Sequence, residues 1–244
     1  MFSDNGRYLV RPLTPSPPTV ARKLLDELQP AGIFGAELVG EGAPENILET
    51  EREALGRVSD KRLWDFTRGR WCARTALVKA GLGNEATPVM IGPSRMPLWP
   101  PFVVGSIAHC DDMAVAVVGH TSRFVSVGVD VEPNLPLPDG VAKQISSQFE
   151  SDRLPFKGPV CWDRLLFCSK EAIYKVWFPI ERRWLGFDDV TVVIDPARQT
   201  FTATLPDEGI IINEQRVTEL CGHFAASSSH LFTIVAIPPL PLPR

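Results

Sequence analysis

Gly128-Val129-Asp130-Val131-Glu132 is the stretch of sequence that decides the fold of this chain. Successive side chains of a β-strand point to opposite faces, so Asp130 and Glu132 share one face while the two valines enter the core. A glycine opens the stretch and a proline follows it, which is typical of a strand that ends where a site can open. The stretch therefore predicts a strand that carries two neighbouring carboxylates.

A helix is predicted further along the chain, over 162–178, with Pro179 ending it. Its central motif is Phe167-Cys168-Ser169-Lys170-Glu171-Ala172-Ile173-Tyr174-Lys175, and its apolar positions repeat every three or four residues. Glu171 lies between Lys170 and Lys175, so we expect its carboxylate to stay ionised at neutral pH.

The other elements follow from hydrophobic periodicity and from turn residues. A long helical pattern over 49–79 is bent near Gly56 to Asp60. A helix is also expected over 141–149. Strands are expected over 102–109, 113–118, 124–132, 190–194, 200–204, 222–226 and 232–237. Each part of the chain thus offers a helix with strands, which predicts an α+β fold.

Composition limits the classes of function. The 244 residues are 44% apolar and carry a net charge of -4, enough for a sizeable core but without the basic signature of a nucleic-acid-binding protein. We expect no membrane span, because the longest apolar run is too short to cross a bilayer. Five cysteines without CxxC spacing favour reduced thiols and a cytoplasmic location.

The acidic groups each have an ordinary and a functional interpretation. Asp130 and Glu132 can be an exposed strand face, or they can hold a hard cation such as Mg²⁺ between their carboxylates. Glu171 and Lys175 can be a surface ion pair of about 0.3–0.5 kcal/mol. The functional alternative is a metal ligand or a base acting through water, with lysines that neutralise phosphate.

Basic residues upstream allow the same two interpretations. Arg70 interrupts an apolar helical stripe, so it is either an internal ion pair or a phosphate clamp with Arg62 and Arg95. His109 closes an apolar strand that includes Ser106. Such a histidine is either structural or a hydrogen-bond donor to phosphate.

Taken together, these motifs resemble those of the 4′-phosphopantetheinyl transferases. The resemblance rests on the strand motif, Trp162-Asp163, the helix motif, Gly105-Ser106-Ile107-Ala108-His109-Cys110, and Arg95-Met96-Pro97-Leu98-Trp99-Pro100, in order and spacing from about Lys61 to Gly186. It extends to the long, monomeric, pseudo-twofold branch found among actinobacterial and secondary-metabolite enzymes, rather than to the short carrier-protein synthases that trimerise.

The resemblance implies two related α+β halves, 1–123 and 124–244, with coenzyme A in the cleft between them. It also implies transfer of the phosphopantetheine arm to a serine of apo acyl or peptidyl carrier proteins, with release of adenosine 3′,5′-bisphosphate. Mg²⁺, or Mn²⁺ in its place, would be held by Asp130, Glu132 and Glu171. Coenzyme A would be bound by Arg62, Arg70, Arg95, Ser106, His109, Asp130, Lys170 and Lys175.

Glu171 is the expected base, directly or through a metal-bound water, and Lys170 and Lys175 are the expected catalytic cations. Two residues depart from the family pattern, since Met96 stands where many relatives carry an acid and Cys168 replaces the commoner serine. Two alternatives stay open: a non-catalytic regulator that binds coenzyme A or a nucleotide, and a hydrolase that uses Ser106 or Cys110 with His109. The hydrolase lacks the Gly-x-Ser-x-Gly elbow.

Overall fold

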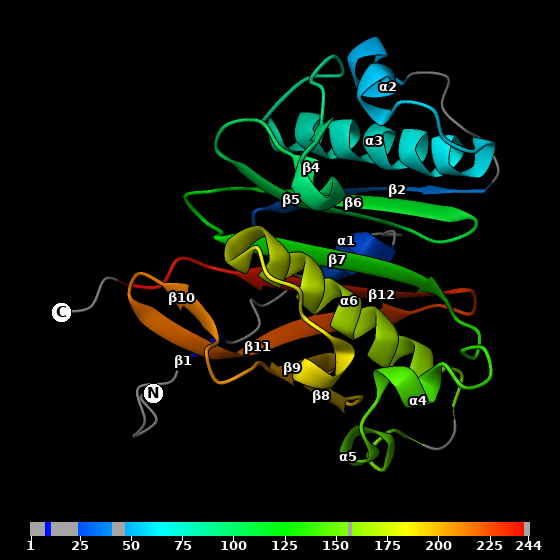
Figure 1. Ribbon diagram of the computed structural model, residues 1–244, viewed down its shortest axis with the longest axis vertical. Helices are drawn as coiled ribbons and strands as arrows, with labels where there is room; N and C mark the ends of the chain where they lie inside the picture. The colour runs from blue at the N-terminus through cyan, green and yellow to red at the C-terminus, as the bar shows by residue number, and fades with distance from the viewer. Residues whose placement is uncertain (1–7, 11–23, 41–46, 156–157, 242–244) are drawn as a thin grey trace.

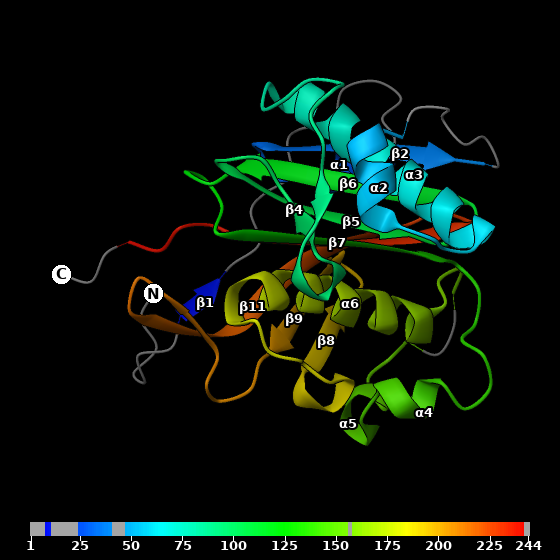
Figure 2. The same cartoon turned by 45° about the horizontal axis from the view of Figure 1, so that its top comes forward.

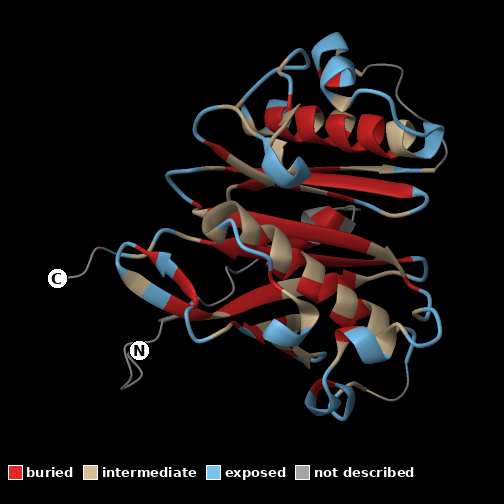
Figure 3. Cartoon of the chain, viewed as in Figure 1, coloured by how far each residue is buried: buried red, intermediate tan, exposed pale blue. Residues whose placement is uncertain are grey.

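The computed structural model describes residues 8–10, 24–40, 47–155 and 158–241. Four layers follow one another in the order helix, sheet, sheet, helix (Figure 1). The outer layers are α3 (Asp60–Ala80) and α6 (Trp162–Glu181). Apolar clusters fill the spaces between α3 and the smaller sheet, between the two sheets, and between α6 and the larger sheet. Figure 3 shows buried residues along both sheets, over the middle turns of α3 and along part of α6. The predicted α+β fold is confirmed.

Two sheets form the middle layers. The smaller has the strand order β2-β6-β5, with bounds Ile33–Val39, Met113–His120 and Val103–His109. The larger has the order β7-β12-β11-β9-β8, with bounds Ser126–Pro133, His230–Ile237, Gln215–Ala226, Thr200–Thr204 and Thr191–Asp195. Two short strands, β1 (Tyr8–Val10) and β10 (Ile210–Ile212), also pair with β11. The strand pairs of both sheets are antiparallel except for that of β1 with β11.

The two halves repeat one topology. In the first, strand β2 precedes α3, and β5 and β6 follow. Strand β2 pairs with β6, and β6 pairs with β5. In the second, β7 precedes α6, and of the later strands β12 pairs with β7 and β11 pairs with β12. The boundary predicted between residues 123 and 124 falls in the turn that joins β6 to β7, and it stays a prediction. β1 pairs with β11, and so lies with the second half although it begins the chain.

Short elements complete the fold. The long helical pattern is divided as expected, into α2 (Glu49–Leu55) and α3. The predicted helix over 141–149 is two short ones, α4 (Ala142–Ile145) and α5 (Gln148–Ser151). Sequence patterns did not predict α1 (Leu24–Leu28), β1, β2, β3 (Met90–Ile91), β4 (Pro97–Leu98), β10, or the single turns η1 (Pro93–Arg95) and η2 (Phe187–Asp189).

The prediction that Pro179 ends the last long helix is wrong, because α6 continues to Glu181. A proline removes one backbone N–H donor, but its φ is compatible with helix, so a last turn can still form. Arg182 ends the helix in a left-handed conformation and donates its N–H to the carbonyl of Phe178 at 3.0 Å.

Candidate active site

Helix α6 lies directly on the face of β7 that carries the carboxylates. Gly128 makes this approach possible, since a β-carbon added there would stand 2.1 Å from the carbonyl oxygen of Ala172. On the opposite face of the strand, Val129 and Val131 are fully buried between the sheets, as predicted. The strand face with Asp130 and Glu132 is therefore covered by a helix that carries Glu171 and Lys175.

Asp130 and Lys175 are the closest pair in this group. The Lys175 Nζ lies 2.6 Å from Oδ1 of Asp130 and donates to the carbonyl of Val129 at 3.2 Å. Burial acts to lower the pKa of Lys175, but Asp130 and then Glu171 outweigh it, so the pKa is raised. The second oxygen of Asp130, Oδ2, is buried, and among the described residues it has no hydrogen-bond partner.

The other two carboxylates share a low-dielectric environment with Asp130. Burial, and then the charge of Asp130, raise the pKa of Glu132 to about 7, although the guanidinium of Arg164 lies 2.9 Å from its Oε2. Burial and Asp130 also raise the pKa of Glu171, against the effect of Lys175. The charge of Asp130 raises the pKa values of both neighbouring carboxylates, and this, together with the Asp130 oxygen that has no partner among the described residues, fits a hard divalent cation.

Lys170 does not join this group, contrary to prediction. It is buried on the other side of α6, where its Nζ lies 2.9 Å from Oε1 of Glu150 and donates to the carbonyl of Phe187 at 2.8 Å. Glu150 also accepts hydrogen bonds from the N–H of Val192 and from Ser147. A step of one residue turns a helical side chain by about 100°, which carries Lys170 away from the face of Glu171. Its ammonium therefore joins α5 and η2 to α6.

The predicted arginines gather around a separate small cavity. Arg62, Arg70 and Arg95 line this arginine cavity of about 180 Å³, together with Phe66 and Ile91. The Nε atoms of Arg62 and Arg70 are both buried, and neither has a hydrogen-bond partner among the described residues. Burial lowers the pKa of Arg70 to about 10. Unsatisfied guanidinium donors around a cavity fit an anion such as phosphate.

Arg70 forms no ion pair with any residue that the structure describes, and its guanidinium donates to the carbonyl of Met90 at 3.4 Å. Its guanidinium lies 4.3 Å from the ring centre of Phe66. The nearby acid Glu51 is paired with Arg74 at 2.5 Å, with both side chains buried, and it also accepts from the N–H of Val89. This ion pair supports α3 behind the arginine cavity.

His109 is influenced by charges from both groups, the arginines and the residues around Asp130. Burial lowers its pKa, and Lys175 and Arg62 lower it further, which places both cations within electrostatic reach of one ring. Its Nδ1 lies 3.8 Å from Oδ1 of Asp65, whose negative charge acts to raise the pKa of His109. A neutral ring in this position can donate one hydrogen bond to an anion.

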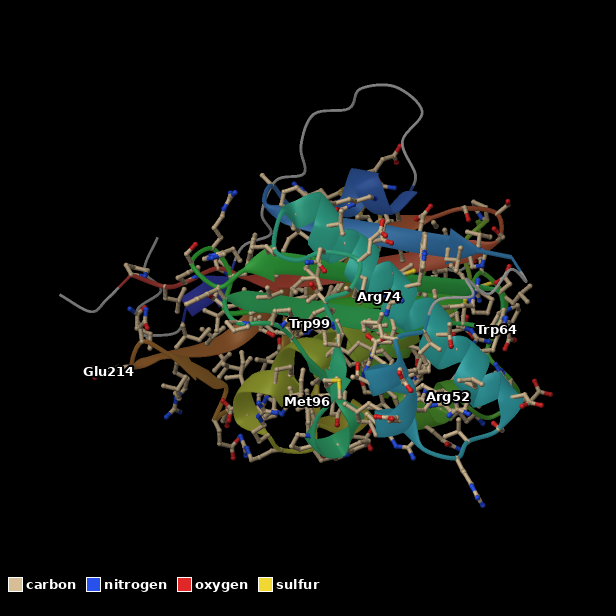
Figure 4. The ribbon with its side chains drawn as sticks, turned by 90° about the horizontal axis from the view of Figure 1, so that it is seen from above. Arg52, Trp64, Arg74, Met96, Trp99 and Glu214 are labelled. Atoms are coloured by element: carbon tan, nitrogen blue, oxygen red, sulfur yellow. The ribbon has the colours of Figure 1, made fainter. Side chains whose placement is uncertain are left out.

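A larger cavity of about 450 Å³ joins the two groups of charges. Arg95 and Lys175 both line this apolar cavity, with the aromatic side chains of Trp99, Tyr174 and Phe178. The segment that bears β3 and β4 extends from the first half across β5 toward the end of α6 (Figure 2). Figure 4 shows Met96 over the ribbon of α6 and Trp99 over β5.

Met96, one of the two departures from the family pattern, makes a polar contact of its own. Its sulfur accepts a hydrogen bond from the guanidinium of Arg182 at the end of α6. Cys168, the other departure, is buried, with its sulfur 3.3 Å from Oγ1 of Thr233. It packs α6 against β12.

Ser106 joins the two halves rather than acting as a nucleophile. Its buried hydroxyl accepts the N–H of Val129 at 3.1 Å, across the line where β5 meets β7. Burial raises the pKa of Cys110 to about 12, so its thiol is protonated at neutral pH. The hydrolase alternative therefore has no activated nucleophile at either of its proposed residues.

Sequence reasoning missed four residues that support the site: Glu51, Asp65, Arg74 and Arg164. Arg164 was recognisable, because it lies seven residues before Glu171, which is two turns along the same helical face. The pairing of Glu51 with Arg74 joins two helices, and no local pattern predicts it.

Two family models match the chain. One, described as the 4′-phosphopantetheinyl transferase N-terminal domain, matches residues 50–119. The other, described as the 4′-phosphopantetheinyl transferase superfamily, matches residues 126–228. The first range contains all of the residues that line the arginine cavity, and the second contains all three carboxylates with Lys175.

Several curated proteins are similar over most of their length. The 4′-phosphopantetheinyl transferase Svp of Streptomyces mobaraensis is 37% identical over 199 residues, which are 80% of each chain. Npt of Nocardia iowensis is 38% identical, over 70% of this chain and 77% of its own. PptT of Mycobacterium tuberculosis is 35% identical, over 88% and 98%. Both of these are also named 4′-phosphopantetheinyl transferases.

Proposed function

Because the chain belongs to the 4′-phosphopantetheinyl transferase family, we propose that it transfers the phosphopantetheine arm of coenzyme A to a serine of apo carrier proteins. Such carriers serve fatty acid, polyketide or nonribosomal peptide synthesis. The observation that carries the proposal is Asp130, with one oxygen on Lys175 and the other buried without a partner among the described residues.

The coenzyme is proposed to lie along the line from the arginine cavity to the carboxylates. Arg62, Arg70 and Arg95 would bind its 3′-phosphate, and Lys175 and His109 would bind its pyrophosphate. The apolar cavity, with Tyr174 and Phe178 in its wall, suits the uncharged part of the molecule. Two observations support this order. Arg95 lines both cavities, and the pKa of His109 is lowered both by Lys175 and by Arg62.

Asp130, Glu132 and Glu171 would hold the divalent ion, which we propose to be Mg²⁺, with Mn²⁺ as a substitute. When bound, such an ion supplies positive charge against the pyrophosphate oxygens. Carboxylate oxygens are the ligands that a hard ion prefers. Because the local dielectric constant is low, the bound cation and the charge of Asp130 would stabilise each other strongly.

In the proposed reaction, the serine oxygen forms a bond to the β-phosphorus as the bond to the bridging pyrophosphate oxygen breaks. Glu171 takes the serine proton, directly or through water. Lys175 and the arginines stabilise the charge that builds on the phosphate oxygens and on the departing adenosine 3′,5′-bisphosphate.

We further propose a cytoplasmic monomer. One chain supplies both the arginine cavity and the carboxylates, so a second copy is not needed to complete the site. All five cysteines are free, which suits a reducing compartment. No helix in the described part of the chain is long and apolar enough to cross a membrane.

The test is to incubate the full chain with coenzyme A, Mg²⁺ and several apo acyl and peptidyl carriers, and to weigh each carrier by mass spectrometry. We expect the mass of the phosphopantetheine arm to be added, to be lost with EDTA, and to return with metal. A carrier whose serine is replaced by alanine is the control. Binding of coenzyme A without any mass gain would instead favour the non-catalytic regulator.

A further inference from the structure

A second cluster of ligand-type side chains lies outside the proposed active site. Cys110 and Asp112 lie in the turn between β5 and β6, and His230 begins β12. The sulfur, one carboxylate oxygen and one ring nitrogen of these residues all lie within 4.8 Å of one another. The cluster therefore brings together a turn of the smaller sheet and the first residue of a strand in the larger sheet.

The distances in this cluster are close to those of a tetrahedral metal site. His230 Nε2 lies 2.8 Å from Oδ1 of Asp112, and the Cys110 sulfur lies 4.0 Å from the same oxygen. With bonds of about 2.3 Å to sulfur and about 2.0–2.1 Å to nitrogen and oxygen, tetrahedral ligands are spaced by roughly 3.3–3.6 Å. These two separations would each need to change by only about half an ångström, and the separation of the sulfur from the His230 nitrogen, which is within 4.8 Å, by at most about 1.2 Å.

The surroundings hold these ligands in place. The second ring nitrogen of the buried His230 lies 2.9 Å from the hydroxyl of Ser229, which orients Nε2 toward Asp112. The carbonyl of Asp112 accepts hydrogen bonds of 2.8 Å from the buried Arg68 guanidinium and from the N–H of Gly40. An oriented histidine and a fixed turn are typical supports of a metal site.

We propose that Cys110, Asp112 and His230 bind one borderline divalent transition metal ion such as Zn²⁺, with a fourth position open to water. Binding converts the Cys110 thiol to a thiolate and releases its proton to solvent. Sulfur and imidazole ligands select such an ion over Mg²⁺, whereas the three carboxylates favour Mg²⁺. The two sites share no ligand.

Cobalt provides the test, because a thiolate bound to Co²⁺ gives a charge-transfer absorption band. The full chain is titrated with Co²⁺ in excess Mg²⁺, which keeps the carboxylates occupied. We expect a band that saturates at one equivalent and disappears when Zn²⁺ is added. Zn²⁺ should also raise the melting temperature, since binding joins the two sheets.

Three variants locate the ion. Cys110→Ser and His230→Ala should lose the band, and Asp112→Asn, at an exposed position, should weaken Co²⁺ binding about 10-fold or more. Cys161→Ser is the matched control, a half-buried cysteine outside the cluster, and should keep the band. Circular dichroism checks the fold of each variant. Absence of the band in the unmodified chain, or its survival in Cys110→Ser, would overturn the proposal.

Discussion

The two halves of this protein share a topology but differ in the charges that they bring to the site. In the first half, α3 buries Arg68, Arg70 and Arg74, and the arginine cavity opens beside it. In the second half, α6 lies over a strand with two carboxylates and adds a third. One half therefore contributes a group of arginines, which we propose to bind phosphate, and the other a group of carboxylates, which we propose to bind a metal ion.

This difference teaches how one fold can bind a molecule with several charges. A strand, a helix and two further strands set the positions, while the residues on each helix decide the sign of the charge. The contrast predicts that changes in the second half affect chemistry, and that changes in the first half affect coenzyme binding.

Glu171→Gln should have the largest effect. The substitution removes the proposed base while keeping the size of the side chain, so kcat should fall about 10²- to 10⁴-fold. Carrier mass gain measures the rate, and circular dichroism checks the fold. Calorimetric titration with Mg²⁺ separates the two roles: an unchanged Kd indicates a base, and a weaker one indicates a ligand. Full activity would remove Glu171 from the mechanism.

Lys170→Met should destabilise the protein rather than act on the chemistry. It leaves the buried Glu150 carboxylate without its ammonium partner, which costs about 3–5 kcal/mol. Urea unfolding measures the change in the free energy of unfolding. The double variant with Glu150→Gln should recover part of the loss, because no unpaired charge remains. A stable Lys170→Met variant without transfer activity would restore the predicted catalytic role.

Arg62→Ala should weaken coenzyme binding with little change in kcat. The loss of a charged hydrogen bond corresponds to about a 10- to 100-fold rise in KM for coenzyme A. Dephospho-coenzyme A, which lacks the 3′-phosphate, should show a much smaller difference between the variant and the unmodified chain. Arg57→Ala, at an exposed position that lines neither cavity, is the control. Equal effects on both coenzymes would place the 3′-phosphate elsewhere.

Metal affinity should depend on pH through Glu132. In the metal-free protein its pKa is raised to about 7, so protons compete with the metal below that value. The Kd for Mg²⁺ should weaken by about tenfold per pH unit as pH falls below 7, and Glu132→Gln should flatten this profile.

The raised pKa of Glu132 also makes the stability of the metal-free protein depend on pH, and here a higher pH is unfavourable. A native pKa above the unfolded value means that the folded metal-free chain binds more protons. Its free energy of unfolding should therefore fall as pH rises from about 4.5 to about 7, and added metal should reverse the loss. A flat unfolding profile in EDTA would contradict the raised pKa.

Most of what the sequence predicted depends on local periodicity. The alternation in 128–132 predicted which side chains enter the core, whereas the approach of Glu171 to the carboxylates was implied by the family resemblance and not by spacing. The residue-by-residue roles stay predictions until variants are measured.

Lys170 shows why the remainder could not be predicted. Its place beside Glu171 in the sequence suggested a shared site, but its partner Glu150 comes from a separate short helix. Strand β2 was missed for a different reason, since Gly35 and Glu37 weaken its strand pattern and its pairing with β6 is long-range. Contacts between distant segments decided both cases.

The contact between β5 and β7 also affects whether each half can stay folded and soluble without the other. Each of these two is the last strand of its sheet, and such a strand exposes backbone groups that invite pairing with other chains. Here the two strands cover one another along the line where Ser106 accepts the N–H of Val129. Cutting the chain at the turn before β7 would uncover both edges at once, so the separate halves should aggregate, whereas the two fragments refolded together should stay in solution.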